Sequence, residues 1–179
     1  MIDIKDEIKK HQIVIVVIPN EQYSEKILYL SKTLAEFGKT IYVSINKPYS
    51  SVVDLLQKNR IPVDRFFFVD AVTKTVKPFG KDGSVEFVSS PSALTELSLT
   101  ISNIVERDEF YSMLFDSLST LLVYQNPLMV TKFVHNLISK FRTMKTKAVF
   151  TILKGGMSSE LINDLSMFAD KIIDFGWSI

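Results

Sequence analysis

Short runs of consecutive apolar residues alternate along the chain with longer segments in which apolar residues recur every three or four positions. The first run, IVIVVI at residues 13–18, consists of β-branched residues, which is typical of a central strand buried on both faces. Later runs predict further strands at residues 40–45, 65–70, 85–88, 111–116, 147–153 and 171–177. Because strands and helical segments alternate from end to end, the pattern favours parallel strands joined by crossover helices.

The segments with helical spacing predict helices at residues 21–37, 50–59 and 158–169, and two more that start at Ser90-Pro91 and Asn126-Pro127. In both of these starts a polar N-cap residue is followed by proline at the first helical position. Gly38 follows the first helix as a C′ residue, and Pro62 prevents the second helix from continuing.

The fold class that follows is α/β, a three-layer αβα arrangement with a mostly parallel central sheet. A chain of 179 residues has the size of one domain, so residues 1–179 are assigned to a single unit. In this interpretation residues 1–12 are an N-terminal extension. Residues 71–84 contain one proline, two glycines and several charges, which predicts an exposed loop.

Composition excludes several kinds of site. The chain contains no cysteine, which rules out disulfides, thiolate metal sites and cysteine nucleophiles. Its two histidines, His11 and His135, are too far apart for metal-ligand spacing, and His135 is expected to be a partly buried structural residue. With 21 basic and 20 acidic residues the net charge is +1, which argues against a dedicated nucleic-acid-binding protein.

The first residues, MIDIKDEIKKHQ, lack the apolar core of a signal peptide. No apolar run approaches the roughly 18 residues that a membrane span needs. We therefore expect a cytoplasmic protein without a membrane partner.

Polar residues follow several predicted strands at their carboxyl ends, where parallel sheets bind ligands. The positions are Pro19-Asn20-Glu21, Asn46-Lys47, Asp70, Asp116-Ser117, Lys154-Gly155-Gly156 and Asp174. Asp116 and Asp70 each have two interpretations, a contact to Mg²⁺ or nucleotide and a purely structural cap, and together they would form a small metal site if their strands were neighbours. Residues 154–156 are either a phosphate-binding nest or an ordinary turn. The phenylalanines at 66–68 are expected in the core.

The segment LFDSLSTLL at residues 114–122 resembles the Walker B region of RecA-like ATPases, and of the KaiC branch in particular. The stretches at 61–73 and 90–101 also resemble the KaiC pattern, as does a later strand ending near Thr151. The likeness spans roughly the whole chain. On this resemblance the chain is identified as an archaeal-type, RecA/KaiC-like member of the P-loop ATPase superfamily. It implies a RecA-like fold with Asp116 as the Walker B aspartate.

The residues that would hold phosphate depart from that family. No G-x-x-x-x-G-K-[ST] motif follows the first strand, so the glycine amides that wrap phosphates are missing. If Lys26 takes the place of the P-loop lysine, Glu21 and Glu25 face the phosphates. Repulsion at about 4 Å costs on the order of 4 kcal/mol, whereas the helix dipole offers only about 1 kcal/mol. The sequence therefore predicts a degenerate Walker A loop.

A second departure concerns hydrolysis. KaiC-like ATPases carry paired glutamates after the second strand to activate the attacking water, and this chain has Asn46-Lys47 there. An amide and a cation cannot accept the proton of that water as a carboxylate can.

The favoured hypothesis is a non-catalytic domain that acts in regulation or assembly through protein contacts, as a homo-oligomer or with a RecA/KaiC-like relative, and without a cofactor. The alternative is an ATPase-like or phosphoryl-transfer enzyme with a remodelled loop. In that case ATP and Mg²⁺ would be bound by Lys26, Asp116 and Ser117, and Asp116 would be both metal ligand and candidate catalytic residue. A nucleic-acid accessory role rests only on Lys74, Lys77 and Lys81, which are more typical of a solvated loop.

Overall fold

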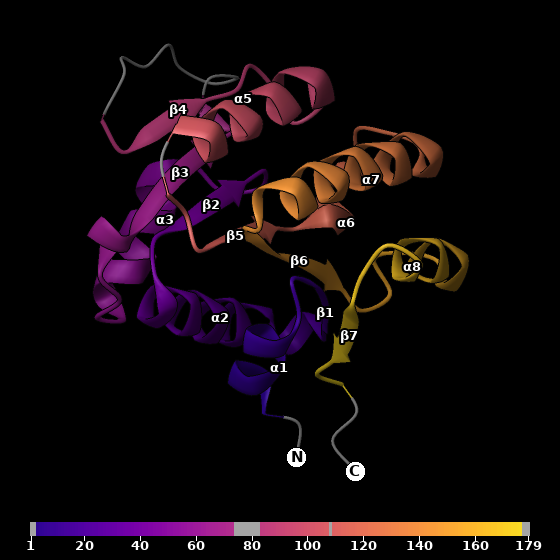
Figure 1. Cartoon of the computed structure of the whole chain (residues 1–179), viewed down its shortest axis with the longest axis horizontal. Coiled ribbons are helices and arrows are strands. Elements are labelled where there is room, and N and C mark those ends of the chain that lie inside the picture. The colour runs from indigo at the N-terminus through magenta and orange to yellow at the C-terminus, as the bar shows by residue number, and fades with distance from the viewer. Residues whose placement is uncertain (1–2, 74–82, 108, 177–179) are drawn as a thin grey trace.

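A single parallel sheet forms the centre of the molecule. The computed structural model describes residues 3–73, 83–107 and 109–176, and within these ranges seven parallel strands pair in the order β4-β3-β2-β5-β6-β1-β7 (Figure 1). The strands are β1 (Ile13–Ile18), β2 (Thr40–Ser44), β3 (Phe66–Asp70), β4 (Val85–Phe87), β5 (Ser112–Asp116), β6 (Lys147–Leu153) and β7 (Lys171–Asp174). This arrangement confirms the predicted parallel α/β sheet, and the bounds of β1 and β6 match the prediction residue for residue.

Helices cover both faces of the sheet (Figure 1). One face carries α1 (Ile4–Lys10), α2 (Tyr23–Phe37) and α3 (Tyr49–Lys58), and the other carries α5 (Leu94–Arg107), α6 (Leu118–Leu121), α7 (Pro127–Met144) and α8 (Ser159–Ser166). Two short 3-10 turns, Asn20–Gln22 and Val63–Arg65, precede α2 and β3. None of the described helices is long and apolar enough to cross a membrane.

The central strands explain the uninterrupted apolar runs of the sequence. Every residue of β1 and β2 is buried, because alternate side chains of each strand enter the two different helical layers. Val14 and Leu114, for example, pack under α1–α3, whereas Ile15 and Phe115 pack under α5–α8. Two apolar cores therefore lie on opposite faces of one sheet.

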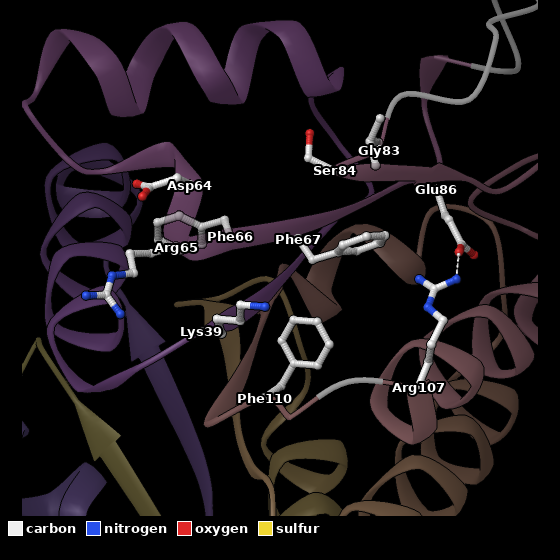
Figure 2. A pocket seen from close by; sticks show the side chains of 11 residues that line it. Lys39, Asp64, Arg65, Phe66, Phe67, Gly83, Ser84, Glu86, Arg107 and Phe110 are labelled. Atoms are coloured by element: carbon white, nitrogen blue, oxygen red, sulfur yellow. Dashed lines mark hydrogen bonds and ion pairs between the residues drawn. The ribbon is translucent and has the colours of Figure 1, made fainter.

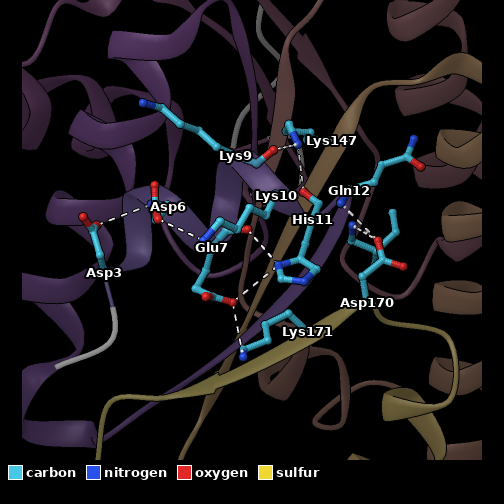
Figure 3. A network of polar contacts seen from close by, with 11 residues as sticks. Asp3, Asp6, Glu7, Lys9, Lys10, His11, Gln12, Lys147, Asp170 and Lys171 are labelled. Atoms are coloured by element: carbon cyan, nitrogen blue, oxygen red, sulfur yellow. Dashed lines mark hydrogen bonds and ion pairs between the residues drawn. The ribbon is translucent and has the colours of Figure 1, made fainter.

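The segment expected to be an N-terminal extension contains the helix α1, whose two isoleucines are buried against the sheet. Lys147 of β6 fixes the end of this helix (Figure 3). Its ammonium donates to the carbonyl oxygens of Lys9 at 3.0 Å and His11 at 2.9 Å, two groups at a helix end where carbonyls need partners. Burial lowers the pKa of the Lys147 ammonium. The helix is thus a packed part of the domain.

One of the two predicted helix starts is wrong. Asn126 caps α7 as expected, since its side chain accepts a hydrogen bond from the backbone N–H of Met129 at 3.0 Å. Ser90 does not cap α5. Its carbonyl instead accepts from the N–H of Ala93 in a separate turn, and the helix begins only at Leu94. Glu96 on the first turn binds Ser89, which ties the preceding chain to the helix in place of the expected cap.

Two side-chain predictions also need correction. His135 is exposed and stacks on Phe168, with ring centroids 4.5 Å apart, so it is a surface residue of α7 and not a partly buried one. Phe66 and Phe68 lie in the core, but Phe67 alternates to the other face and is only partly covered.

Most of the predicted exposed loop, residues 74–82, falls outside the described residues. The lysines at 74, 77 and 81 fall there too.

Gly38 follows the last residue of α2, and a second chain segment approaches it closely. Its N–H still bonds to the carbonyl of Leu34, but its backbone is extended, unlike the left-handed C′ conformation usual for glycine. A Cβ atom at this position would lie 2.7 Å from the Cβ of Tyr111, which leads into β5. The absent side chain therefore lets the end of α2 contact the start of β5.

We predict that Gly38→Ala lowers the free energy of unfolding by about 1–3 kcal/mol, because Tyr111 Cβ is held by its backbone and cannot move aside freely. Urea unfolding measures the change. Gly83→Ala is the matched control, since among the described residues no atom other than those of its chain neighbours lies within 4 Å of its Cβ position, and it should change stability by less than about 0.5 kcal/mol. Equal effects of the two substitutions would contradict the close-approach explanation.

Candidate functional site

Asp116 is the polar residue at the centre of the sheet's carboxyl edge. It ends β5, which lies between β2 and β6, and it is 0 % exposed. Both of its carboxylate oxygens accept hydrogen bonds from tyrosine hydroxyls. The Tyr42 hydroxyl of β2 donates to Oδ2 at 2.6 Å, and the Tyr23 hydroxyl donates to Oδ1. Asp116 therefore lies in a closed cluster of side chains, away from solvent.

Tyr23 reaches this cluster from the first position of α2. After β1 ends at Ile18, the chain makes one short turn and enters the helix at Tyr23, whose ring is buried. The Tyr23 hydroxyl lies 3.0 Å from Oγ1 of Thr151 on β6, and that oxygen in turn donates to the carbonyl of Phe115 at 3.0 Å. The ring thus spans β6 to arrive at β5. We call Tyr23, Tyr42, Asp116 and Thr151 the Asp116 cluster.

Burial and neighbouring charge raise the pKa values of the ionisable groups in the Asp116 cluster. Burial raises the pKa of the Asp116 carboxyl, although the two tyrosine hydroxyls, the charge of Lys47 and the Asn46 side chain act in the opposite direction. Burial and the neighbouring carboxylate raise the pKa values of Tyr23 and Tyr42 well above the ordinary range. Both hydroxyls therefore stay protonated at neutral pH and serve as donors to Asp116.

Ser117 is buried beside the cluster and is not accessible to a ligand. A cis peptide bond joins it to Asp116. Its hydroxyl is close enough to Tyr23 to lower the pKa of that phenol slightly, but within the described part of the chain it makes no hydrogen bond of ordinary geometry. Ser117 occupies the N-cap position of α6 without a capping bond from its side chain.

Lys26, the proposed phosphate-binding lysine, points elsewhere. Its ammonium lies 2.9 Å from Oε1 of Glu25 and 5.1 Å from the centre of the Phe175 ring. Among the described residues, Lys26 and Asp116 share no hydrogen bond or ion pair. Glu21 and Glu25 are both exposed to solvent. The predicted repulsion is therefore not what shapes this loop, because the carboxylates turn outward and Tyr23 turns inward.

Asp70 and Asp116 do not form a joint metal site. β2 separates their strands, so the condition for the joint site, neighbouring strands, is not met. The carboxylate of Asp70 accepts hydrogen bonds from the backbone N–H groups of Tyr49, Val72 and Thr73, at 2.7 to 2.9 Å, and thereby holds the turn after β3. In the described ranges no group of three or more histidine, aspartate or glutamate side chains is placed to hold a metal ion.

Residues 154–156 form the turn between β6 and α8. Gly155 has a positive φ of 78°, and the N–H of Gly156 donates to the carbonyl of Leu153 at 2.8 Å. The Lys154 ammonium lies 3.5 Å from the Asp174 carboxylate. These contacts are those of an ordinary strand-to-helix turn.

The two tyrosines were missed by sequence reasoning, although one signal was present. A buried tyrosine needs a partner for its hydroxyl, and Tyr42 is the aromatic residue with a polar tip in the otherwise aliphatic run IYV. In the observed register Ser44 lies opposite Asp116, so Tyr42, two residues earlier and opposite Leu114, lies on the same face of the sheet. The partner of the Tyr42 hydroxyl can be identified only when the pairing of β2 with β5 is known.

Residues 28–175 match the model of a family described as a family of unknown function (DUF7504). The chain belongs to this family. No curated protein matches it in sequence.

Two solved structures share the fold. The KaiC-like protein PH0186 from the hyperthermophilic archaeon Pyrococcus horikoshii is 12% identical, with a TM-score of 0.62 over 91% of this chain and 71% of its own. The uncharacterized protein PH0321 from Pyrococcus horikoshii, solved in complex with an unknown peptide, is also 12% identical, with a TM-score of 0.68 over 94% and 82%. At this identity the likeness concerns the fold alone, which is confirmed as RecA/KaiC-like.

The burial of Asp116 predicts a specific pH dependence. Its pKa is raised in the folded state, so the folded protein keeps the proton at pH values where the unfolded chain, with a pKa near 3.8, has lost it. The stability that protonated Asp116 contributes is complete below the unfolded pKa and is lost as pH rises towards the folded pKa. As pH rises through this range, the free energy of unfolding of the wild type should fall relative to that of Asp116→Asn. The total fall is about 1.4 kcal/mol for each tenfold difference between the acid dissociation constants of Asp116 in the folded and in the unfolded protein.

Urea unfolding at intervals between about pH 3 and pH 7 measures the difference in free energy of unfolding between wild type and Asp116→Asn. The slope of stability against pH reports the difference in bound protons between the folded and unfolded states. Asp54→Asn is the matched control, because Asp54 is an exposed carboxylate on α3. A difference between wild type and Asp116→Asn that does not change with pH would contradict the burial of a titrating carboxyl group.

Proposed function

We propose that this protein is a non-catalytic RecA/KaiC-like domain that acts in regulation or assembly through contacts with other proteins. The observation that carries the proposal is the position of Tyr23. Its ring lies between the start of α2 and Asp116, which is where a nucleotide-binding relative would need phosphate and Mg²⁺ to meet the Walker B aspartate. A magnesium ion takes about six oxygen ligands and gives up water reluctantly, so a buried carboxylate already bound by two hydroxyls is a poor ligand for it.

The connection from β1 to α2 supports a degenerate Walker A loop. It consists of Pro19 and the 3-10 turn Asn20–Gln22, with no glycine. Proline has no N–H, and the N–H of Gln22 already bonds to the carbonyl of Pro19 at 3.0 Å. Few backbone N–H groups are therefore left to surround a phosphate in the way a P-loop does.

An apolar patch supports a role in protein contacts. We give the name apolar patch to the large exposed hydrophobic side chains of α5, of the turn after α6 and of the first turn of α7, which are Leu99, Val123, Tyr124, Leu128 and Met129. Leu99 and Met129 also line one groove of about 590 Å³ between α5 and α7. Soluble monomers rarely expose large contiguous apolar surface, and such surface marks interaction sites. The related fold of PH0321 was solved with a peptide bound, which is consistent with this role.

The proposal predicts no nucleotide chemistry at Asp116. The chain is titrated by calorimetry with ATP and with ADP, to millimolar concentration and with or without Mg²⁺. We expect no heat of binding that depends on both Mg²⁺ and the Asp116 carboxylate. The purified chain should also release no phosphate from ATP, because Asn46 and Lys47 cannot act as the base that a hydrolytic water needs.

Asp116→Asn and Asp54→Asn are the paired variants for this titration, since both remove one carboxylate and only the first touches the cluster. Micromolar binding that depends on Mg²⁺ and disappears in Asp116→Asn alone would overturn the proposal and return the chain to the nucleotide-using enzymes.

A homo-oligomer assembled through the apolar patch should be sensitive to one polar substitution. We expect Leu128→Asn to weaken self-association roughly tenfold or more, because an amide buried in an apolar interface loses its water without gaining a partner. Sedimentation velocity over a range of concentrations measures the effect. Met167→Asn is the control, as Met167 is also a large exposed apolar residue but lies at the end of α8. A wild-type chain that stays monomeric at all concentrations would contradict self-association.

A further inference from the structure

A groove at the opposite edge of the sheet is independent of the Asp116 cluster. It has a volume of about 630 Å³ and is lined by residues at the amino ends of β2, β3 and β4 (Figure 2). Asp116, by contrast, lies at the carboxyl end of β5. Its walls include Lys39, Arg65, Phe67, Glu86, Arg107 and Phe110. Grooves that bind small molecules have volumes of about 300–1,000 Å³, so this one is large enough for a small ligand.

Two phenylalanine rings form the apolar part of the groove. Phe67 at the start of β3 and Phe110 before β5 meet edge to face, with ring centroids 6.2 Å apart. Both side chains are partly exposed, whereas Phe66 and Phe68, on either side of Phe67 in β3, are buried. The exposed parts of the two rings offer an apolar surface of the kind that packs against another aromatic ring.

Cations lie against this aromatic surface. The guanidinium of Arg107 lies 5.4 Å from the centre of the Phe67 ring, and its Nη1 donates to Oε1 of Glu86 at 2.8 Å. Figure 2 shows that the Lys39 side chain extends toward the same two rings. A guanidinium has five N–H donors, and the bond to Glu86 uses one of them. The Arg107 side chain is 56 % exposed, so further donors are accessible from solvent.

The balance of charge in the groove is positive. Lys39, Arg65 and Arg107 provide three cations, and Asp64 and Glu86 provide two carboxylates, of which Glu86 is held by Arg107. An anion that approached Arg107 would form charge-assisted hydrogen bonds, which are about twice as strong as neutral ones. A ligand with both an anionic group and a flat ring would satisfy the cations and the phenylalanines together.

We propose that this groove binds a small anion that carries an aromatic ring, such as an aromatic carboxylate or an aryl phosphate. The ring packs on Phe67 and Phe110, and the anionic group accepts hydrogen bonds from Arg107 with Lys39 nearby. The site does not rest on the proposed function, because its residues are separate from the Asp116 cluster.

The test uses the full chain and two probes, 1-naphthyl phosphate and 1-naphthoate, followed by chemical shifts in ¹H–¹⁵N NMR spectra. Inorganic phosphate and neutral 1-naphthol are the matched probes, since each carries only half of the proposed chemistry. We expect saturable shifts around Phe67, Arg107 and Phe110 with a dissociation constant of about one millimolar or tighter for the charged aromatic probes. The two half probes should bind at least about tenfold more weakly.

Two groove variants and one control locate the binding. Arg107→Gln and Phe110→Ser should each weaken it at least about tenfold, and Lys132→Gln, the same loss of charge on the exposed face of α7, should leave it unchanged. The dispersion of each spectrum shows that the variant is folded, and Arg107→Gln replaces an exposed side chain.

The proposal is overturned if no probe gives saturable shifts at about 10 mM, if Lys132→Gln weakens binding as much as Arg107→Gln, or if inorganic phosphate binds as well as the aryl phosphate. If a nucleotide binds in this groove, Arg107→Gln should abolish its binding and Asp116→Asn should leave its binding unchanged. That pattern separates this site from nucleotide chemistry at the carboxyl edge.

Discussion

A carboxylate buried at the end of a central strand needs hydrogen-bond donors at the same place, because an unsatisfied buried charge costs several kcal/mol. In this protein the donors are the phenols of Tyr23 and Tyr42, which come from α2 and β2 and meet on β5. The hydrogen bond from Tyr23 to Asp116 thereby links the start of α2 to the central strand β5. Both tyrosines that satisfy Asp116 are themselves buried, and the carboxylate is 0 % exposed.

The two edges of the sheet therefore differ in chemistry. At the carboxyl edge Asp116, Asp70 and Thr151 form hydrogen bonds within the protein. At the amino edge, the groove beside Phe67 and Arg107 leaves rings and charges partly open to solvent. Parallel sheets usually bind ligands at the carboxyl edge. In this RecA/KaiC-like fold the aspartate at the centre of the carboxyl edge is buried, whereas Arg107 at the amino edge is exposed.

Much of the fold could be predicted from the sequence because its strands are buried on both faces. The β-branched run of β1 and the cap at Asn126 are local signals, and both were confirmed. The cap expected at Ser90 failed because Glu96, seven residues after Ser89, binds that residue and holds the chain in a turn. The helix α1 was not predicted, as its stability comes from contacts with β6 that are distant in sequence.

The sequence by itself determined the parallel α/β architecture, the position of Asp116 at a strand end and the lack of a glycine-rich loop after β1. Those features follow from periodicity, residue type and motif spacing, which are properties of neighbouring residues. Tertiary structure alone decided that Tyr23 and Tyr42 meet at Asp116, that Lys26 points away, and that β2 separates Asp70 from Asp116. The physical reason is that strand order and the direction of each side chain depend on pairings between residues far apart in the chain, which local patterns do not encode.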